Sequence, residues 1–388
     1  MSANIITPLV PVIYRALDTI PRELVGAIPA VRRWPSTVRV AKNQPITFPV
    51  VPTMSVTDVA AAATAGPDPS GITIGSDTLS MTNSKWVNFP WSGEEAAGLD
   101  SSGLFAPILQ DQFSQAFREI GNLIEADLCA LATASSRAYG DVSKVPFSTA
   151  NDLSDLNFTK KILKDNGSPQ GDLHFILSTN DHATLQSIQT TVYKANEYGN
   201  REGLEMGTLS KLQNVNIHES GQIQTHTAGT GTGQTVTGGA YGDTTIVVSG
   251  GSTGSGILPG DVVTIGGNKY VVATAMATVS GITSFGIYAP GIVTPAGVVG
   301  QTVTNIGNYE ADWMIDRNAV VLISALPNMP PMGDIAADTK VVVDPVTGLQ
   351  FEIAIYKQTM QATWSVRAAW GVKMVKPAFS ALLLSKPQ

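Results

Sequence analysis

The sequence predicts an α+β protein that contains more extended chain than a compact domain needs. Three observations support this: a helical periodicity over residues 104–137, period-two strands after residue 349, and a Gly-rich β segment over 221–308 that interrupts a mixed α/β pattern. Long alternating strands are typical of an antiparallel sheet with one packed face. A chain of 388 residues is long enough for roughly two to three domains and a sizeable core.

The composition excludes several classes of protein. Charged residues make up 14% of the chain, against about 25% in an ordinary soluble domain, and hydrophobic residues make up 43%. A disordered chain needs low hydrophobicity and high net charge, and a coiled coil needs many charged positions, so neither class fits. The net charge of −7 argues against a dedicated nucleic-acid binder, because neutralising phosphates requires clustered Lys and Arg.

Cysteine usage and the first residues bear on the compartment. The single cysteine, Cys129, excludes an intramolecular disulfide framework and cannot form a zinc site alone. The N-terminus lacks the basic region of a signal peptide, and the longest apolar run, 319–326, is too short to cross a bilayer. We therefore expect no membrane partner and a protein made in the cytoplasm of its cell.

Residues 1–44 are expected to form an N-terminal arm. Prolines repeatedly interrupt a weak helical spacing of apolar residues, and basic residues outnumber acidic ones in this segment. Such a stretch can hardly build a core of its own. We therefore expect it to lie against another surface.

Residues 45–95 are expected to form an extended loop with flanking strands. One strand is predicted over 45–51 and a second over 78–91, although the alternation in the second lapses over 82–85. Between them lies a turn-rich stretch, 66–71. A loop of this length inside a compact domain is improbable unless it serves a function.

Residues 96–150 contain the clearest helix, expected over 104–137 with a length of about 50 Å. Ser101 or Ser102 is the expected N-terminal cap, and Gly140 is expected to end the segment. Polar residues such as Glu125 are expected on other faces than the packed one. Apolar residues recur at helical spacing and should form that packed face: Phe113, Phe117, Ile120, Ile124, Leu128 and Leu131.

Residues 151–220 are expected to form a mixed α/β unit, with helices over 152–165 and from Asn180 or Asp181 to 188, and strands over 173–177 and 215–220. Residues 221–308 hold more than half of the 37 glycines and are expected to form an inserted small β-barrel or sandwich module. Residues 309–388 are expected to supply mostly strands.

A search for chemistry finds no catalytic, cofactor-binding or metal site. The Gly-rich runs 229–233 and 250–256 lack the Lys-Ser/Thr that completes a phosphate loop. The four histidines lack the spacing of a helical zinc pair, and Asp181-His182 has no accompanying nucleophile elbow. Glu94 and Glu95 are adjacent, so their carboxylates need not face one another, and they suit a helix N-terminus instead.

Five residues are candidates for contacts between subunits. Arg32, Arg33 and Trp34 form the one basic-aromatic cluster, which suits a neighbouring acidic subunit at least as well as a nucleic acid. Trp86 and Trp91 lie at the root of the extended loop, where aromatic residues often anchor interfaces.

The order of these parts resembles the major capsid protein of tailed bacteriophages, the Hong Kong 97 fold. Three stretches are similar to the branch from short-tailed phages that has an inserted β-domain: 173–182, 256–267 and 312–327. The resemblance implies that 1–44 is an arm, 45–95 an extended loop and 96–150 a spine helix with a peripheral domain. It likewise implies that 151–220 begins an apical domain, and that 309–388 supplies strands to the apical and peripheral domains.

The resemblance implies a non-enzymatic shell protein. It would self-assemble as hexamers and pentamers into the icosahedral head, inside the host cytoplasm, and remain in the virion. Portal and scaffolding proteins would be its partners, packaged double-stranded DNA would be contacted non-specifically, and no cofactor would be needed. A tail, baseplate or fibre-associated structural protein is the alternative, and an enzyme with a β-module is a third hypothesis that no constellation supports.

Overall fold

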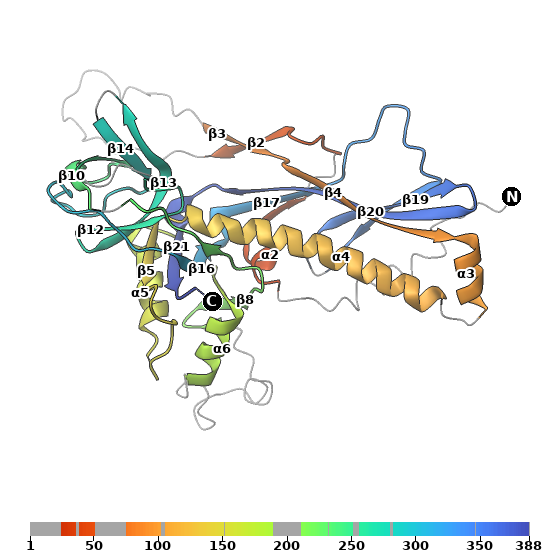
Figure 1. Ribbon diagram of the computed structural model, residues 1–388, viewed down its shortest axis with the longest axis horizontal. Helices are drawn as coiled ribbons and strands as arrows, with labels where there is room; N and C mark the ends of the chain where they lie inside the picture. The colour runs from red at the N-terminus through yellow and green to blue at the C-terminus, as the bar shows by residue number, and fades with distance from the viewer. Residues whose placement is uncertain are drawn as a thin grey trace, which may run out of the picture.

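The computed structural model describes residues 25–35, 39–50, 75–101, 105–150, 152–188, 211–231, 233–250, 256–279, 282–345 and 347–387. Most of the expected arm (1–24) and the middle of the expected loop (51–74) lie outside the described residues. The architecture is α+β, built from two large sheets and one long helix (Figure 1). The described helices include none that is both long and apolar enough for a membrane span.

The first sheet has six strands around one long central strand. Its order is β1-β17-β20-β19-β18, and β4 also pairs with β20. β20 pairs antiparallel with β4, β17 and β19, whereas β1 pairs parallel with β17. The strands are β1 (Arg32–Pro35), β4 (Asn83–Ser92), β17 (Val320–Ala325), β18 (Asp338–Val343), β19 (Gln350–Gln358) and β20 (Gln361–Met374).

Helix α4 (Phe105–Ala130) lies along one face of this sheet (Figure 1). The predicted apolar face is confirmed, because Phe113, Phe117, Ile120, Ile124 and Leu128 are all buried and Leu131 is partly buried. Aromatic rings join helix to sheet, with Phe117 at 5.0 Å from Phe351 between ring centroids. The 26 residues span about 39 Å, so the element crosses most of the sheet.

The helix starts within one residue of the expected position, but its expected C-terminal end and the Ser101 cap were wrong, and the other cap candidate, Ser102, lies outside the described residues. Residues 131–134 form a 3-10 turn, and Arg137–Gly140 form strand β5, which pairs parallel with β21 (Ser380–Ser385). The sheet hydrogen bonds therefore override continued helical spacing. Ser101 lies at the C-terminal end of a separate helix, α3 (Gly93–Asp100), which begins at a capping box formed by Ser92 and Glu95.

The expected strand over 78–91 is two strands. β3 (Gly75–Ser80) pairs with β2 (Pro45–Val50), while β4 pairs with β20. The interruption of the alternating pattern, noted over 82–85, coincides in part with the gap between the two strands at residues 81–82. Successive β17 residues point to opposite faces, so Val321 and Ile323 pack with Leu79 and Met81 on the face away from α4.

The second sheet has thirteen strands in the order β10-β11-β14-β13-β5-β21-β16-β6-β8-β7, with β9, β12 and β15 attached. Helices α5 (Ser154–Asp165) and α6 (Thr179–Ile188) lie at this end of the molecule (Figure 1). Ser178, not Asn180 or Asp181, caps α6, because its Oγ accepts the Asp181 N–H at 3.3 Å. The remaining strands are β6 (Leu173–Leu177), β7 (Lys211–Leu212), β8 (Val215–Glu219), β9 (Thr225–His226), β10 (Thr235–Gly238), β11 (Thr245–Ser249), β12 (Val262–Ile265), β13 (Asn268–Val279), β14 (Ile282–Ile287), β15 (Thr304–Asn305) and β16 (Tyr309–Asp316).

The Gly-rich segment has a hydrophobic cluster of its own, formed by buried residues from Val236 to Val303. It joins the rest of the sheet where Tyr270 of β13 pairs with Arg137 of β5. Its strands include β11, β12 and β14, and the longest is β13 with 12 residues. The domain boundary 221–308 and its closure into a barrel stay predictions.

Candidate assembly surface

The basic-aromatic cluster lies on an edge strand. Among the described residues, β1 pairs only with β17, which leaves its other edge unpaired. The Arg32 guanidinium lies 5.3 Å from the centroid of the Trp34 ring, and Trp34 is 43% exposed. Arg33 donates a hydrogen bond from Nη1 to the carbonyl of Thr347. A hollow of about 380 Å³ lies beside this strand, lined by Arg33, Trp34, Leu322, Ser324, Pro345, Gly348 and Leu349.

The two tryptophans of β4 have different environments. Trp86 is 62% exposed. Trp91 instead donates from Nε1 to Gln112 Oε1 at 2.7 Å, and its ring packs edge-on against Phe105. Strands β17 and β20 separate β1 from β4, so the structure does not bring the five candidates together. Their role in subunit contacts stays a prediction, and Trp91 already has partners within its own chain.

Sequence reasoning missed the most exposed apolar residues of the sheet. Met332 is 100% exposed and Ile335 is 89% exposed, both on the loop that joins β17 to β18. The loop is held in place, because Gly333 N–H donates to the Pro330 carbonyl and Asp334 accepts hydrogen bonds from Tyr356 and Arg367. These donors also lower the pKa of Asp334.

Three further exposed apolar residues belong to the same sheet. Val341 and Val343 lie on β18, which pairs only with β19 among the described strands, and Met360 lies at the turn from β19 to β20. We call the set of Trp86, Met332, Ile335, Val341, Val343 and Met360 the apolar rim. Its members lie on strands, a loop and a turn, and each is at least 42% exposed in the described chain.

Glu125 was expected on a polar face of its helix, but it is buried and binds residues near the start of the described chain. We call residues 25–31 the N-terminal segment. Glu125 is fully buried, and its oxygens accept the backbone N–H groups of Gly26, Ala27 and Ile28 at 2.8, 2.6 and 3.0 Å. Oε1 also accepts the Ser220 hydroxyl at 2.8 Å. Burial raises the pKa of Glu125, and these hydrogen bonds act in the opposite direction.

The fit of the N-terminal segment also depends on Gly26. A Cβ atom at this position would lie 2.6 Å from the Glu219 carbonyl oxygen and 3.1 Å from the His218 Cβ. The short helix α2 (Ala27–Ala30) therefore sits between α4 and β8 with no room for a side chain at its start. This is where the expected arm joins the body of the chain.

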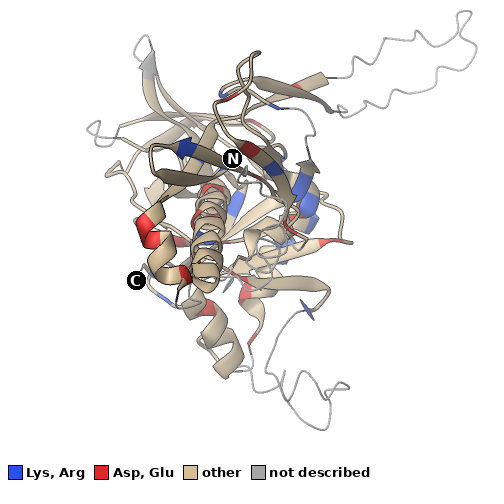
Figure 2. Cartoon of the chain, turned by 90° about the vertical axis from the view of Figure 1, so that its right-hand side faces the viewer, with Lys and Arg blue, Asp and Glu red and all other residues tan. Residues whose placement is uncertain are grey.

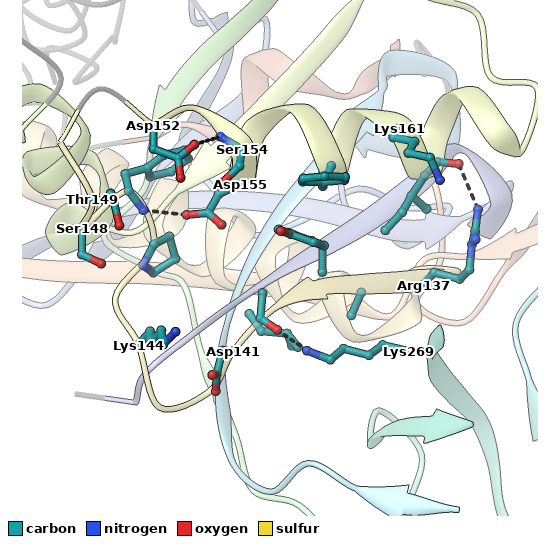
Figure 3. A pocket seen from close by; sticks show the side chains of 18 of the residues that line it. Arg137, Asp141, Lys144, Ser148, Thr149, Asp152, Ser154, Asp155, Lys161 and Lys269 are labelled. Atoms are coloured by element: carbon teal, nitrogen blue, oxygen red, sulfur yellow. Dashed lines mark hydrogen bonds between the residues drawn. The ribbon is translucent and has the colours of Figure 1, made fainter. Parts of the chain in front are cut away.

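A cavity of about 520 Å³ lies between α5, β5 and the turn at 267–269 (Figure 3). Several of its charged groups bond to the chain itself: Lys269 donates to the Gly140 carbonyl, and Asp155 accepts the Phe147 N–H at 2.8 Å. Arg137 donates to Asn166 Oδ1 at 3.0 Å. Neither His nor Cys lines this cavity, so its serine hydroxyls have no imidazole base.

Two other observations bear on chemistry. In the parts of the chain that the structure covers, no group of three or more His, Cys, Asp or Glu residues could hold a metal ion. Cys129 is buried, and burial raises the pKa of its thiol, which makes it a packing group instead of a nucleophile. Both acidic and basic residues are visible along the described strands and helices in the view of Figure 2.

Comparisons with known proteins find similarity in structure alone. No family model and no curated protein matches the chain. The capsid of the cyanophage P-SCSP1u is 8% identical, with a TM-score of 0.45, over 92% of this chain and 87% of that one. The capsid of the native GTA particle is 10% identical, with a TM-score of 0.46, over 94% and 91%. A virus-like particle from Pyrococcus furiosus is 9% identical, with a TM-score of 0.40, over 97% and 98%.

Proposed function

We propose that this chain is a major capsid protein, which assembles with copies of itself into an icosahedral shell around a phage genome. The observation that carries the proposal is the apolar rim, a set of large apolar side chains that the described chain leaves uncovered along one sheet. These residues come from two strands, a loop and a turn of the sheet, and large exposed apolar side chains of this kind are candidates for contacts with another protein surface. We assign the chain no catalytic activity, cofactor or metal.

The six-stranded sheet suits a subunit that must stay rigid while it packs against other copies in a shell. α4 covers one face over about 39 Å, and the β2–β3 side of the chain packs on the other. One face is therefore covered by the helix, and the other face is covered only in part, so exposed side chains such as Val341 and Val343, together with the edges and loops, are left for contacts with other copies. A loop such as 328–337, fixed by Asp334, presents Met332 without a large ordering cost on binding.

Weak contacts between subunits give a stable assembly when every subunit of a ring repeats them. Burying apolar surface contributes about 25 cal/mol per Å², and much of this is offset by the cost of association. Head-to-tail contacts that close into rings repeat the gain at every subunit, which fits hexamers and pentamers. The net charge of −7 fits a wall that contacts packaged double-stranded DNA only non-specifically.

The remaining assignments belong to the same proposal. We infer the Hong Kong 97 fold, with residues 221–308 as an inserted β-module and with the arm 1–44 and the loop 45–95 contacting neighbouring copies outside the parts, 25–31 and β4, that pack within the subunit. Assembly would take place in the host cytoplasm with portal and scaffolding proteins, and the product would be the virion. The predicted contact residues on strands β1 and β4 of the sheet are Arg32, Arg33, Trp34 and Trp86.

The test is assembly of the purified chain, observed by negative-stain microscopy and sedimentation velocity. We expect closed particles or hexamer and pentamer rings from the unmodified chain. A Met332→Ser/Ile335→Ser double variant should keep its circular dichroism melt and lose at least ten-fold in particle yield, since only the rim is changed.

The control is Val299→Ser, which alters a residue of similar exposure (63%) in the Gly-rich segment. It should assemble normally. A monodisperse small species from the unmodified chain at high concentration would contradict the capsid proposal. Normal particle yield from the double variant, or an equal loss in the control, would contradict the role of the rim.

A further inference from the structure

Two histidines face each other beside the N-terminal segment. His174 on β6 and His218 on β8 lie on adjacent parallel strands, and His174 Nδ1 is 2.8 Å from His218 Nε2. On its other side, His174 Nε2 is 2.8 Å from Asp172 Oδ1. His174 is 2% exposed, so the pair is shielded from water on that ring.

One arrangement of protons satisfies these two contacts, and it leaves the nearby Arg317 Nη2 as a neighbouring positive charge without a hydrogen bond to His174. With His174 Nε2–H donating to Asp172, His174 Nδ1 must accept, and His218 Nε2–H donates to it. Both rings are then neutral. If both became protonated, two N–H groups would point at each other across 2.8 Å, which removes the hydrogen bond and adds repulsion.

Arg317 couples this pair to the N-terminal segment. Its Nε lies 3.1 Å from Asp172 Oδ2, its Nη2 lies 3.2 Å from His174 Nε2, and the same Nη2 donates to the Pro29 carbonyl at 3.4 Å. From the other strand, the His218 Cβ lies directly against Gly26. Helix α2 is therefore contacted by His218 next to its first residue and by Arg317 near its last residue.

We propose that His174 and His218 form an acid-sensitive latch, which holds residues 25–31 on the body of the chain at neutral pH and loosens them on acidification. Protonation would place two imidazolium charges beside Arg317, with only Asp172 and Asp316 to balance them. The other charged groups nearby are committed elsewhere: Glu219 pairs with His182 at 3.0 Å, and Glu125 binds the backbone of the segment. Residues 25–31 carry no ionisable side chain.

The direction of the pH effect follows from the environment of the rings. Burial, His174 and Arg317 lower the pKa of His218 from 6.5 to about 4, and burial chiefly lowers that of His174. A released ring regains an ordinary pKa near 6.5, so the released state binds the proton more tightly. The latch is therefore fully effective above pH 6.5, weakens as pH falls, and is lost by about pH 4.

The test is amide hydrogen exchange, corrected for the intrinsic effect of pH, on the intact chain. Between pH 7.5 and pH 5 we expect protection of residues 25–31 to fall by about 30-fold, while β16 keeps its protection. His218→Gln should remove most of this pH dependence, because the amide can still donate to His174 Nδ1 but does not titrate. His182→Gln, which changes a histidine on α6, should behave like the unmodified chain.

Several results would overturn the latch. These are unchanged protection of 25–31 down to pH 5, simultaneous loss of protection in β16, or an equal fall in the His218→Gln chain. If that variant does not fold, carbon-13 NMR of the histidines in the unmodified chain decides: a His218 that titrates below pH 5 supports the latch, and one that titrates at 6.5 or above refutes it. The inference concerns a single chain, so its outcome is independent of whether shells form.

Discussion

Glu125 offers the sharpest test of how the N-terminal segment is held. In Glu125→Ala, three backbone N–H groups and the Ser220 hydroxyl lose their acceptor in a site closed to water. Each unsatisfied buried donor costs about 1–3 kcal/mol, and local relaxation recovers part of the total. We therefore expect a loss of about 4 kcal/mol in the free energy of unfolding. Glu125→Gln keeps one oxygen and should lose about 1–3 kcal/mol.

The assay is urea unfolding at pH 7, followed by tryptophan fluorescence and circular dichroism. The matched control is Glu119→Ala, which removes an exposed carboxylate from the same helix and should change stability by no more than about 0.5 kcal/mol. If Glu125→Ala is as stable as Glu119→Ala to within about 1 kcal/mol, the carboxylate does not anchor the segment and the reasoning is refuted.

Three further predictions concern the frame of the subunit. Phe117→Ala should cost about 3–5 kcal/mol of unfolding free energy, because Phe117 is 2% exposed, whereas Gln115→Ala on the exposed face should be near neutral. Gly26→Ala should cost about 1–3 kcal/mol by collision with Glu219, while Gly98→Ala, with open space around it, should stabilise α3 by up to about 1 kcal/mol; equal thermal melts would contradict this. Replacing residues 51–74 by a short Gly-Ser linker should leave the melting curve intact and abolish stable shells; normal shells would show that the loop is dispensable.

Periodic patterns predicted the frame of the fold well. The packed face of α4 and the long strands β19 and β20 repeat at the spacing of their own backbone, so local sequence determines them. The end of α4 could not be predicted in this way. Residues 137–140 become a strand because they pair with residues 381–384, a partner remote in sequence that leaves no local signal.

The assembly surface was less predictable, because exposure is a property of the folded chain. The sequence treats Trp86 and Trp91 alike, yet Gln112 and Phe105 cover only the second. No sequence pattern marks Met332, whose exposure depends on a loop that Asp334 fixes through Tyr356 and Arg367. Glu125 has the spacing of a surface residue, and its backbone donors lie almost one hundred positions earlier in the chain.

Strand β21 has a consequence for biosynthesis. Residues 380–385 lie between β5 and β16 and are buried along their whole length. Until the ribosome has released this stretch, β5 and β16 have no common neighbour, and two unpaired backbone edges stay open to solvent. A nascent polypeptide thus cannot complete its larger sheet until translation has passed this point. Stalled or truncated products would be the ones most prone to aggregate.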